Sequence, residues 1–249
     1  MINLVCVTWS YEETYEIKQT FLYKSFVKEN DKLNFHHIHF NRNNYIDLEK
    51  KFDSDFGYQY EFLLYRIYLL KDILKDLPHE NLLFSDTNDV VCLGDIQILS
   101  HSISDKVVFS CESHQYPNEN NISNWYPINT YSEDNKKNRI FLNAGISYGN
   151  RKSYIDLFEK IMSDVFPLKY KNFGGDQGVF TYLYLNTEKK LLDIDTNKIF
   201  LNTYSISDSN FYKKNDKLYE NGHNSPFLLV HDNGWNYGSP KFIERFQLI

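Results

Sequence analysis

Two carboxylates three residues apart, Asp86 and Asp89, follow a short apolar run over residues 82–84. Such a run is typical of a strand buried on both faces, and acids at its C-terminal end lie where an open α/β sheet builds its ligand site. Neighbouring carboxylates repel each other unless a cation lies between them, and a hard divalent cation bound to phosphate is the usual partner. For this spacing alone, a solvated Asp-rich turn is the better interpretation. The metal site gains its support from the rest of the chain.

The residues before this stretch predict the elements that position it. Residues 2–8 are expected to form a first, central strand, and residues 35–40 a second. Ser10 and Glu13 form a capping-box pattern, which predicts that a helix opens there. Its apolar positions are Ile17, Phe21, Leu22, Ser25 and Phe26. The second strand carries three histidines on alternating faces, so at most two can converge, and we interpret them as strand histidines near the surface rather than as metal ligands: His36, His37 and His39.

The stretch is flanked by further predicted elements of an α/β pattern. An apolar stripe predicts a helix over residues 60–77, which ends before Pro78. Gly94 marks a turn, and Asp95 is expected to cap a helix over residues 96–101. Residues 106–111 form the next predicted strand.

The second half of the chain contains shorter elements. Residues 116–137 are polar, and a loop of that length is typical of a lid or a disordered segment; its Trp125 and Tyr126 either contact a ligand or pack the loop down. A strand over 139–148 is expected to be broken at 143–145, and helices are expected over 152–165 and from Gln177 through Tyr184. Short strands are predicted over 191–195, 199–203, 217–220 and 227–231, before a C-terminal helix from Pro240. The fold class is therefore α/β, with a mixed, mainly parallel sheet flanked by helices and a small antiparallel addition.

Composition limits the classes of function. The 249 residues suit one domain, in which we expect a nucleotide-binding half over residues 1–112 and an acceptor half over 113–249. The net charge is −6 without a basic block, so a nucleic-acid partner is not expected. Cys6, Cys92 and Cys111 lie far apart and predict buried thiols rather than disulfides or zinc ligands. With neither a signal-peptide pattern nor a membrane-spanning run, the chain is expected to be soluble and cytoplasmic.

Five stretches, in this order, resemble the glycosyltransferase domain of procollagen lysyl hydroxylases, a GT-A fold. The resemblance runs from Leu4 to about Trp235. The stretches are Phe84-Ser-Asp86-Thr-Asn-Asp89-Val, Lys106-Val-Val-Phe-Ser, Phe141-Leu-Asn143-Ala-Gly145, Gly175-Asp176-Gln177 and Val230-His231-Asp-Asn233-Gly234. Retaining glycosyltransferases related to glycogenin and to bacterial lipooligosaccharide galactosyltransferases share several of them.

The resemblance implies a UDP-hexose donor held by Mn²⁺, with Asp86, Asp89 and His231 as the metal ligands. Ligand chemistry agrees, because carboxylate and phosphate oxygens suit Mg²⁺ or Mn²⁺ and one imidazole shifts the preference toward Mn²⁺. The alternative for His231 is a hydrogen-bonded histidine at a strand end. The implied reaction transfers glucose to galactosylhydroxylysine of a collagen-like chain, with retention. A glycan acceptor, a catalytically impaired sugar-binding protein and a nucleotide-sugar hydrolase or phosphatase are the alternatives.

The resemblance also implies roles for residues around the donor. Asp176, followed by Gln177, faces the transferring sugar and the acceptor; Gly174 and Gly175 stand where the family has further aspartates, and an N-cap is the alternative role for Asp176. Asn143, in its Asn-Ala-Gly145 stretch, is expected to bridge sugar hydroxyls or to be a turn amide. Arg66 corresponds to a lysine that would clamp a phosphate, or else is a solvated helix charge. Three further positions complete the expected donor site: Thr8, which meets the base, Asn88, which replaces a base-covering aromatic, and the motif glycine Gly234. With Asn88 there, the base is expected to stack on another ring, such as Phe52 or Tyr45.

Overall fold

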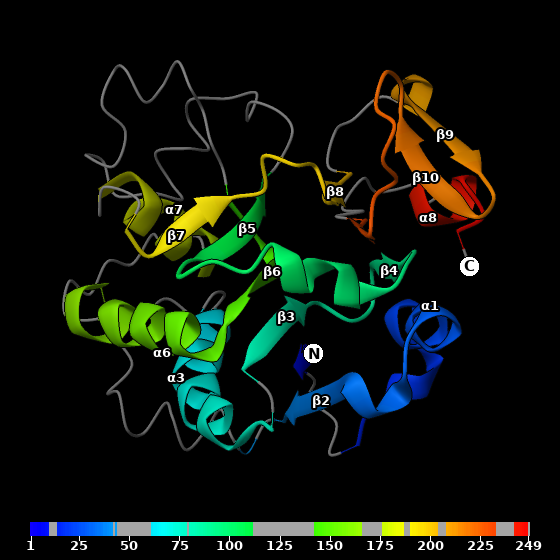
Figure 1. The fold of residues 1–249 in the computed structure, drawn as a ribbon. Coiled ribbons are helices and arrows are strands. Elements are labelled where there is room, and N and C mark those ends of the chain that lie inside the picture. Colours follow the sequence, from blue (N-terminus) through cyan, green and yellow to red (C-terminus); the bar gives the residue numbers. More distant parts are fainter. Residues whose placement is uncertain are drawn as a thin grey trace.

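A mixed six-stranded sheet forms the centre of the computed structural model, which describes residues 1–9, 14–41, 43, 61–78, 80–111, 142–165, 176–186, 190–203, 208–232 and 242–248. Its strand order is β2-β1-β3-β6-β5-β7 (Figure 1). The strands are β1 (Ile2–Trp9), β2 (Phe35–Phe40), β3 (Asn81–Ser85), β5 (Val107–Cys111), β6 (Leu142–Asn150) and β7 (Leu192–Ile194). Only β6 runs against its neighbours; all other pairings are parallel. This confirms the predicted fold class, although the reversal of β6 was not expected.

The sheet is buried on both faces, which explains its near-continuous apolar strands. On one face, Val5 of β1 and Phe84 of β3 pack against three helices: α3 (Glu61–Asp76), α6 (Arg151–Lys160) and α7 (Asp176–Asn186) (Figure 1). On the other face, Leu4 and Leu83 pack with residues of α1 (Phe21–Glu29) and of the 3-10 helix η3 (Ile96–His101). Within the described ranges, every helix is too short or too polar to cross a membrane.

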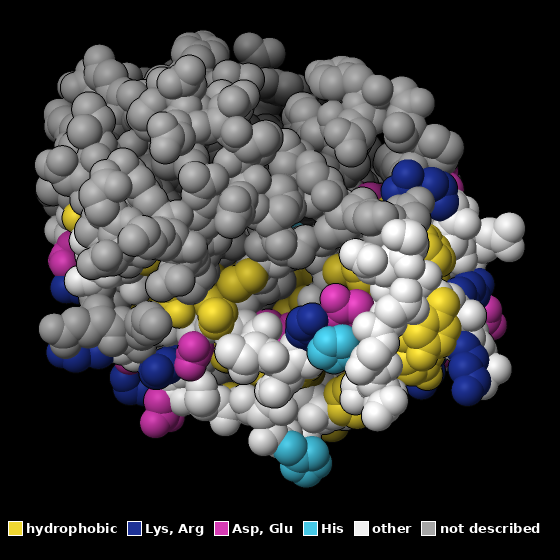
Figure 2. Space-filling view, turned by 90° about the horizontal axis from the view of Figure 1, so that it is seen from above, with side chains coloured by type: hydrophobic (Ala, Val, Ile, Leu, Met, Phe, Trp, Pro, Cys, Tyr) yellow, Lys and Arg dark blue, Asp and Glu magenta, His cyan; other side chains and the backbone are white. Residues whose placement is uncertain are grey.

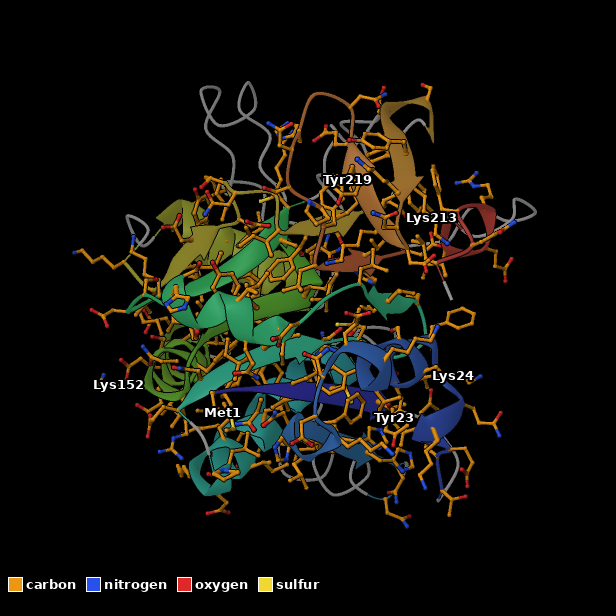
Figure 3. The ribbon with its side chains drawn as sticks, turned by 45° about the vertical axis from the view of Figure 1, so that its right-hand side comes forward. Met1, Tyr23, Lys24, Lys152, Lys213 and Tyr219 are labelled. Carbon is orange, nitrogen blue, oxygen red and sulfur yellow. The ribbon has the colours of Figure 1, made fainter. Side chains whose placement is uncertain are left out.

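A smaller three-stranded sheet lies beside the central one, in the order β4-β11-β8. It consists of β4 (Val90–Cys92), β8 (Phe200–Asn202) and β11 (Leu229–His231), with β11 antiparallel to β4 and parallel to β8. Its core also contains residues of α8 (Phe242–Arg245) and of the hairpin formed by β9 (Phe211–Lys214) and β10 (Lys217–Glu220). Lys213 and Tyr219 mark this hairpin in Figure 3. The hairpin confirms the antiparallel addition, although only its second strand was predicted.

Several element boundaries differ from the predictions. The first helix does not open at Ser10, because residues 14–16 are not helical and a 3-10 turn, η1 (Ile17–Gln19), comes before α1. Thr20 caps α1 instead, its hydroxyl accepting the N–H of Tyr23 at 3.3 Å, while Ser10 and Glu13 lie outside the described residues. The helix predicted over 152–165 is α6 followed by a π-helical turn, η4 (Ile161–Val165). Two further 3-10 turns are η2 (Lys32–Asn34) and η6 (Asp208–Asn210).

Strand β6 is continuous rather than broken at residues 143–145. Its pairing with β5 instead jumps, from Phe109 opposite Ser147 to Ser110 opposite Asn143, so residues 144–146 form a bulge. Bulges of this kind re-aim side chains and are frequent next to active sites. The bulge brings the Gly145 carbonyl to the N–H of Asp86, which donates to it at 2.9 Å.

The three cysteines are free, as expected. Cys6 and Cys92 are buried, and burial raises the pKa of the Cys92 thiol to about 12. Both therefore behave as small apolar side chains in the core.

Candidate functional site

Asp86, Asp89 and His231 converge at the C-terminal end of β3. The two acids flank the turn between β3 and β4, and His231 is brought beside them because β11 pairs with β4, placing it opposite Val90. His231 Nε2 lies 3.3 Å from Asp89 Oδ2 and 3.8 Å from Asp86 Oδ2. One ligand atom from each residue can be chosen so that all lie within 4.8 Å of one another. The residues predicted from separate parts of the chain therefore form one cluster.

Two buried amides determine which nitrogen of His231 carries a proton. His231 Nδ1 lies 3.0 Å from Asn143 Oδ1 and 3.1 Å from Asn202 Oδ1. Asn143 Oδ1 also accepts the Gly145 N–H at 2.8 Å, and Asn202 Nδ2 donates to the Cys111 carbonyl at 3.2 Å, so backbone groups fix the orientation of both amides. Since amide oxygens only accept, Nδ1 must be the donor. In the neutral ring, Nε2 then presents its lone pair toward the two carboxylates.

This donor set fits a divalent cation. Two carboxylate oxygens and one unprotonated imidazole nitrogen are ligands that Mn²⁺ accepts, and a metal-bound histidine normally donates its other N–H to a carbonyl or carboxylate. Asp86 and Asp89 are partly exposed, with side-chain exposures of 34% and 29%, whereas that of His231 is 7%. A buried, oriented nitrogen beside two accessible carboxylates is suited to hold a cation that also meets a ligand from solvent.

Gly145 leaves the space in which the His231 ring lies. A Cβ atom at position 145 would lie 2.1 Å from His231 Cε1 and 2.4 Å from Nδ1, far inside van der Waals contact. The glycine of the Asn-Ala-Gly stretch is therefore explained by close approach to His231. Asn143 is 2% exposed and its oxygen faces His231, so here it supports the ring; the expected contact between Asn143 and a sugar stays a prediction.

A comparison with known protein families identifies the family of the chain. The family model described as PLOD GT domain, the glycosyltransferase domain of lysyl hydroxylase type, matches residues 63–239. The chain belongs to this family. It is therefore a glycosyltransferase domain, and Asp86, Asp89 and His231 all fall within the matched residues.

One solved structure that this chain resembles is described as a glycosyltransferase involved in the glycosylation of the major capsid of PBCV-1. The two share 11% identity over 93% of each chain, with a TM-score of 0.49. The curated proteins contain no match to the chain.

Arg66 belongs to the site rather than to a solvated helix surface. Its Nη1 lies 3.2 Å from Asp86 Oδ1, and its side chain is 16% exposed. A guanidinium there offsets the repulsion between the two acids and stands beside the place expected for a phosphate. A pocket beside the site is lined by Arg66 and Asp86 and by apolar side chains that include Phe84, Ala144 and Phe180.

A second group of polar and aromatic side chains lies at the ends of β1 and β2. The Thr8 hydroxyl lies 3.1 Å from that of Thr87, in the turn between β3 and β4, and 3.0 Å from His37 Nε2. The His37 and His39 rings are stacked with centroids 6.3 Å apart, so they share one face of β2. Burial, and then the charge of His39, lower the pKa of His37, which favours its neutral form.

The ring of Tyr15 packs on this histidine pair. Its centroid lies 5.6 Å from that of His37 and 5.8 Å from that of His39, and its hydroxyl donates to Asn88 Oδ1. Sequence reasoning missed Tyr15 and Asn202. It interpreted the histidines as strand histidines near the surface, of which at most two converge, and His37 and His39 are the two that do, both partly exposed.

The remaining predicted residues are placed less completely. Asp176 begins α7, but its side chain lies outside the described residues, as do Gly234, Phe52, Tyr45, Trp125 and Tyr126. Gln177 is partly exposed in the first turn of α7. Seen from above, described acidic, basic and histidine side chains adjoin one another beside apolar surface (Figure 2).

Proposed function

We propose that this domain transfers a hexose, with glucose favoured, from UDP-hexose to a hydroxyl acceptor in a reaction that depends on Mn²⁺. The observation that carries the proposal is the convergence of Asp86, Asp89 and His231 Nε2, with Nδ1 held as a donor by two oriented amides. The cation would neutralise the donor diphosphate and stabilise it as the leaving group. Asp86, Asp89 and His231 would hold it.

Other described residues have roles that follow from their positions. Arg66 stands at Asp86, where its guanidinium can donate to a phosphate oxygen and orient the diphosphate. The nucleoside would extend from there toward Thr8. Asn88 cannot cover a base as an aromatic ring would, and we expect Tyr15, beside His37 and Asn88, to take that part.

We expect the acceptor to bind beside α7. Asp176 and Gln177 open this helix, and we expect Asp176 to contact the sugar or accept the acceptor proton. In its most specific form, the acceptor is galactosylhydroxylysine of a collagen-like chain; a glycan acceptor is the alternative. Gly174 and Gly175 leave no second carboxylate beside Asp176 for a double displacement, and Gln177 is a poor nucleophile. We therefore expect transfer on the same face of the sugar, assisted by the departing UDP, with retention at C1.

The proposal is tested by measuring UDP release from UDP-glucose and other UDP-hexoses, with and without Mn²⁺ and with and without galactosylhydroxylysine peptide. We expect release that requires Mn²⁺ and increases with acceptor. The anomeric signal in proton NMR of the product should show an α-glycoside. Release that ignores every acceptor would indicate a hydrolase. Folded protein that binds Mn²⁺ and UDP but transfers no hexose would indicate a sugar-binding protein.

A further inference from the structure

Asp232, the residue after His231, is a buried carboxylate whose two oxygens hold two different segments. It is 3% exposed. Its Oδ1 accepts the Thr203 hydroxyl at 2.7 Å, and its Oδ2 accepts the N–H of Ile243 at 3.1 Å, in the first turn of α8. Burying a carboxylate is unfavourable unless donors satisfy it, so this pair of contacts determines how the three segments can be arranged. The side chain therefore ties the end of β11 to the end of β8 and to the C-terminal helix.

The main chain at the same position reaches the metal-binding turn. The N–H of Asp232 donates to the Asp89 carbonyl at 2.7 Å, and the N–H of Thr203 donates to the His231 carbonyl at 3.0 Å. Thr203 directly follows Asn202, whose amide oxygen faces His231 Nδ1. Asp232 is thus linked to one acid of the cluster, to the histidine, and to a residue that orients the histidine.

The C-terminal helix α8 packs against the strands that carry the metal-binding cluster. Phe242 and Ile243 of α8 are 1% and 0% exposed, and they pack in one core with Val91 and Val230. Val91 and Val230 lie on the strands that carry the cluster, since β4 follows Asp89 and β11 ends at His231. A shift of α8 would therefore be transmitted to both strands.

We propose that Asp232 is a positioning residue for the metal centre, which holds Asp89, His231 and Asn202 in register by anchoring them to α8. The inference rests on the proposed function, since it requires that Asp86, Asp89 and His231 bind the cation. Partners of metal ligands that do not touch the metal commonly change metal affinity by about 10- to 100-fold when they are replaced. We expect Asp232 to act in this range.

The test compares Mn²⁺ binding by electron paramagnetic resonance in the full chain and in three folded variants. Asp232→Asn keeps the shape but offers one acceptor oxygen, so either the Thr203 hydroxyl or the Ile243 N–H loses its partner. We expect its Kd for Mn²⁺ to rise about tenfold or more. Thr203→Val removes the hydroxyl that donates to Asp232 Oδ1 and keeps the Ile243 contact, so it should raise the Kd for Mn²⁺ by less than Asp232→Asn does. Ile243→Val trims the same core but keeps the main-chain N–H, so it should bind Mn²⁺ like the parent.

A second readout separates positioning from general destabilisation. In pulsed spectra of bound Mn²⁺, the coupling to the His231 nitrogen should weaken in Asp232→Asn and stay unchanged in Ile243→Val. Parent-like Kd and coupling in Asp232→Asn, or equal losses in Ile243→Val, would overturn the positioning role while leaving the metal site intact. If Asp232→Asn does not fold, parent-like binding by Thr203→Val overturns it. A parent protein that shows no histidine coupling would instead remove the proposed metal centre, and this inference with it.

Discussion

Replacing Gly145 by alanine places one methyl group against the His231 ring. The new Cβ would lie 2.1 Å from Cε1 and 2.9 Å from Nε2, and carbon atoms pack no closer than about 3.5 Å, so ring or strand must move by more than about 1 Å. A metal site tolerates ligand displacements of only about 0.2 Å. The ring cannot keep both its ligand position and its Nδ1 contacts with Asn143 and Asn202. We therefore expect Mn²⁺ affinity to fall at least about 100-fold, with a loss of stability of about 1–3 kcal/mol from overpacking.

The assay combines Mn²⁺ binding by electron paramagnetic resonance with urea unfolding. Gly149→Ala is the matched control, because this glycine is also in β6 and its added Cβ would meet the Lys106 carbonyl at 3.2 Å and Val107 Cα at 3.3 Å, away from His231. It should lose stability but bind Mn²⁺ like the parent. Parent-like Mn²⁺ affinity in folded Gly145→Ala would refute the assignment of His231 as a ligand.

Four further substitutions have defined outcomes. Asp86→Ala and Asp89→Ala should each abolish Mn²⁺-dependent UDP binding in calorimetry. The thermal midpoint should change little, because each substitution removes the repulsion between the two acids, and in Asp86→Ala this offsets the loss of the ion pair with Arg66. Mn²⁺-dependent UDP binding by either variant would contradict the site. Asn150→Ala removes the cap of α6, where the amide oxygen accepts the Ser153 N–H at 2.7 Å. The substitution should lower the unfolding free energy measured in urea by about 1 kcal/mol. An unchanged urea midpoint would contradict the capping role of Asn150. Burial raises the pKa of Asp195 in the folded state above its usual 3.8, so the native protein binds more protons there, and stability relative to Asp195→Asn should fall as pH rises above about 4. A pH-independent difference between the two would contradict this ionisation.

Individual strands and helices could be predicted because each depends on the order of apolar and polar residues within its own segment. The apolar run before Asp86 identified β3, and the stripe before Pro78 identified α3 almost to the residue. The helix expected from Ser10 begins later, because Ile17 lies in a 3-10 turn and the Thr20 hydroxyl caps α1. The antiparallel direction of β6 could not be foreseen. The pattern of apolar and polar residues predicts that a strand forms, but it does not predict the direction in which the strand runs in the sheet.

Some residues of the candidate site could likewise be predicted from the sequence, and others could not. The spacing of Asp86 and Asp89 after an apolar run suggested a site, and the resemblance to a known family added His231. The pairing of β11 with β4 brings the three residues together. Asn202 could not be found, because nothing in its neighbourhood shows that β8 lies beside β11. The support of His231 is made of contacts 29 and 88 residues apart in the chain, which local patterns do not reveal.

The most direct test of the proposed metal centre is anomalous diffraction at the manganese edge from crystals grown with Mn²⁺ and UDP. We expect one strong peak within bonding distance of a carboxylate oxygen of Asp86, a carboxylate oxygen of Asp89 and His231 Nε2, with UDP phosphate oxygens completing the coordination. A peak elsewhere, or UDP bound without an ion at these three residues, would contradict the proposed site.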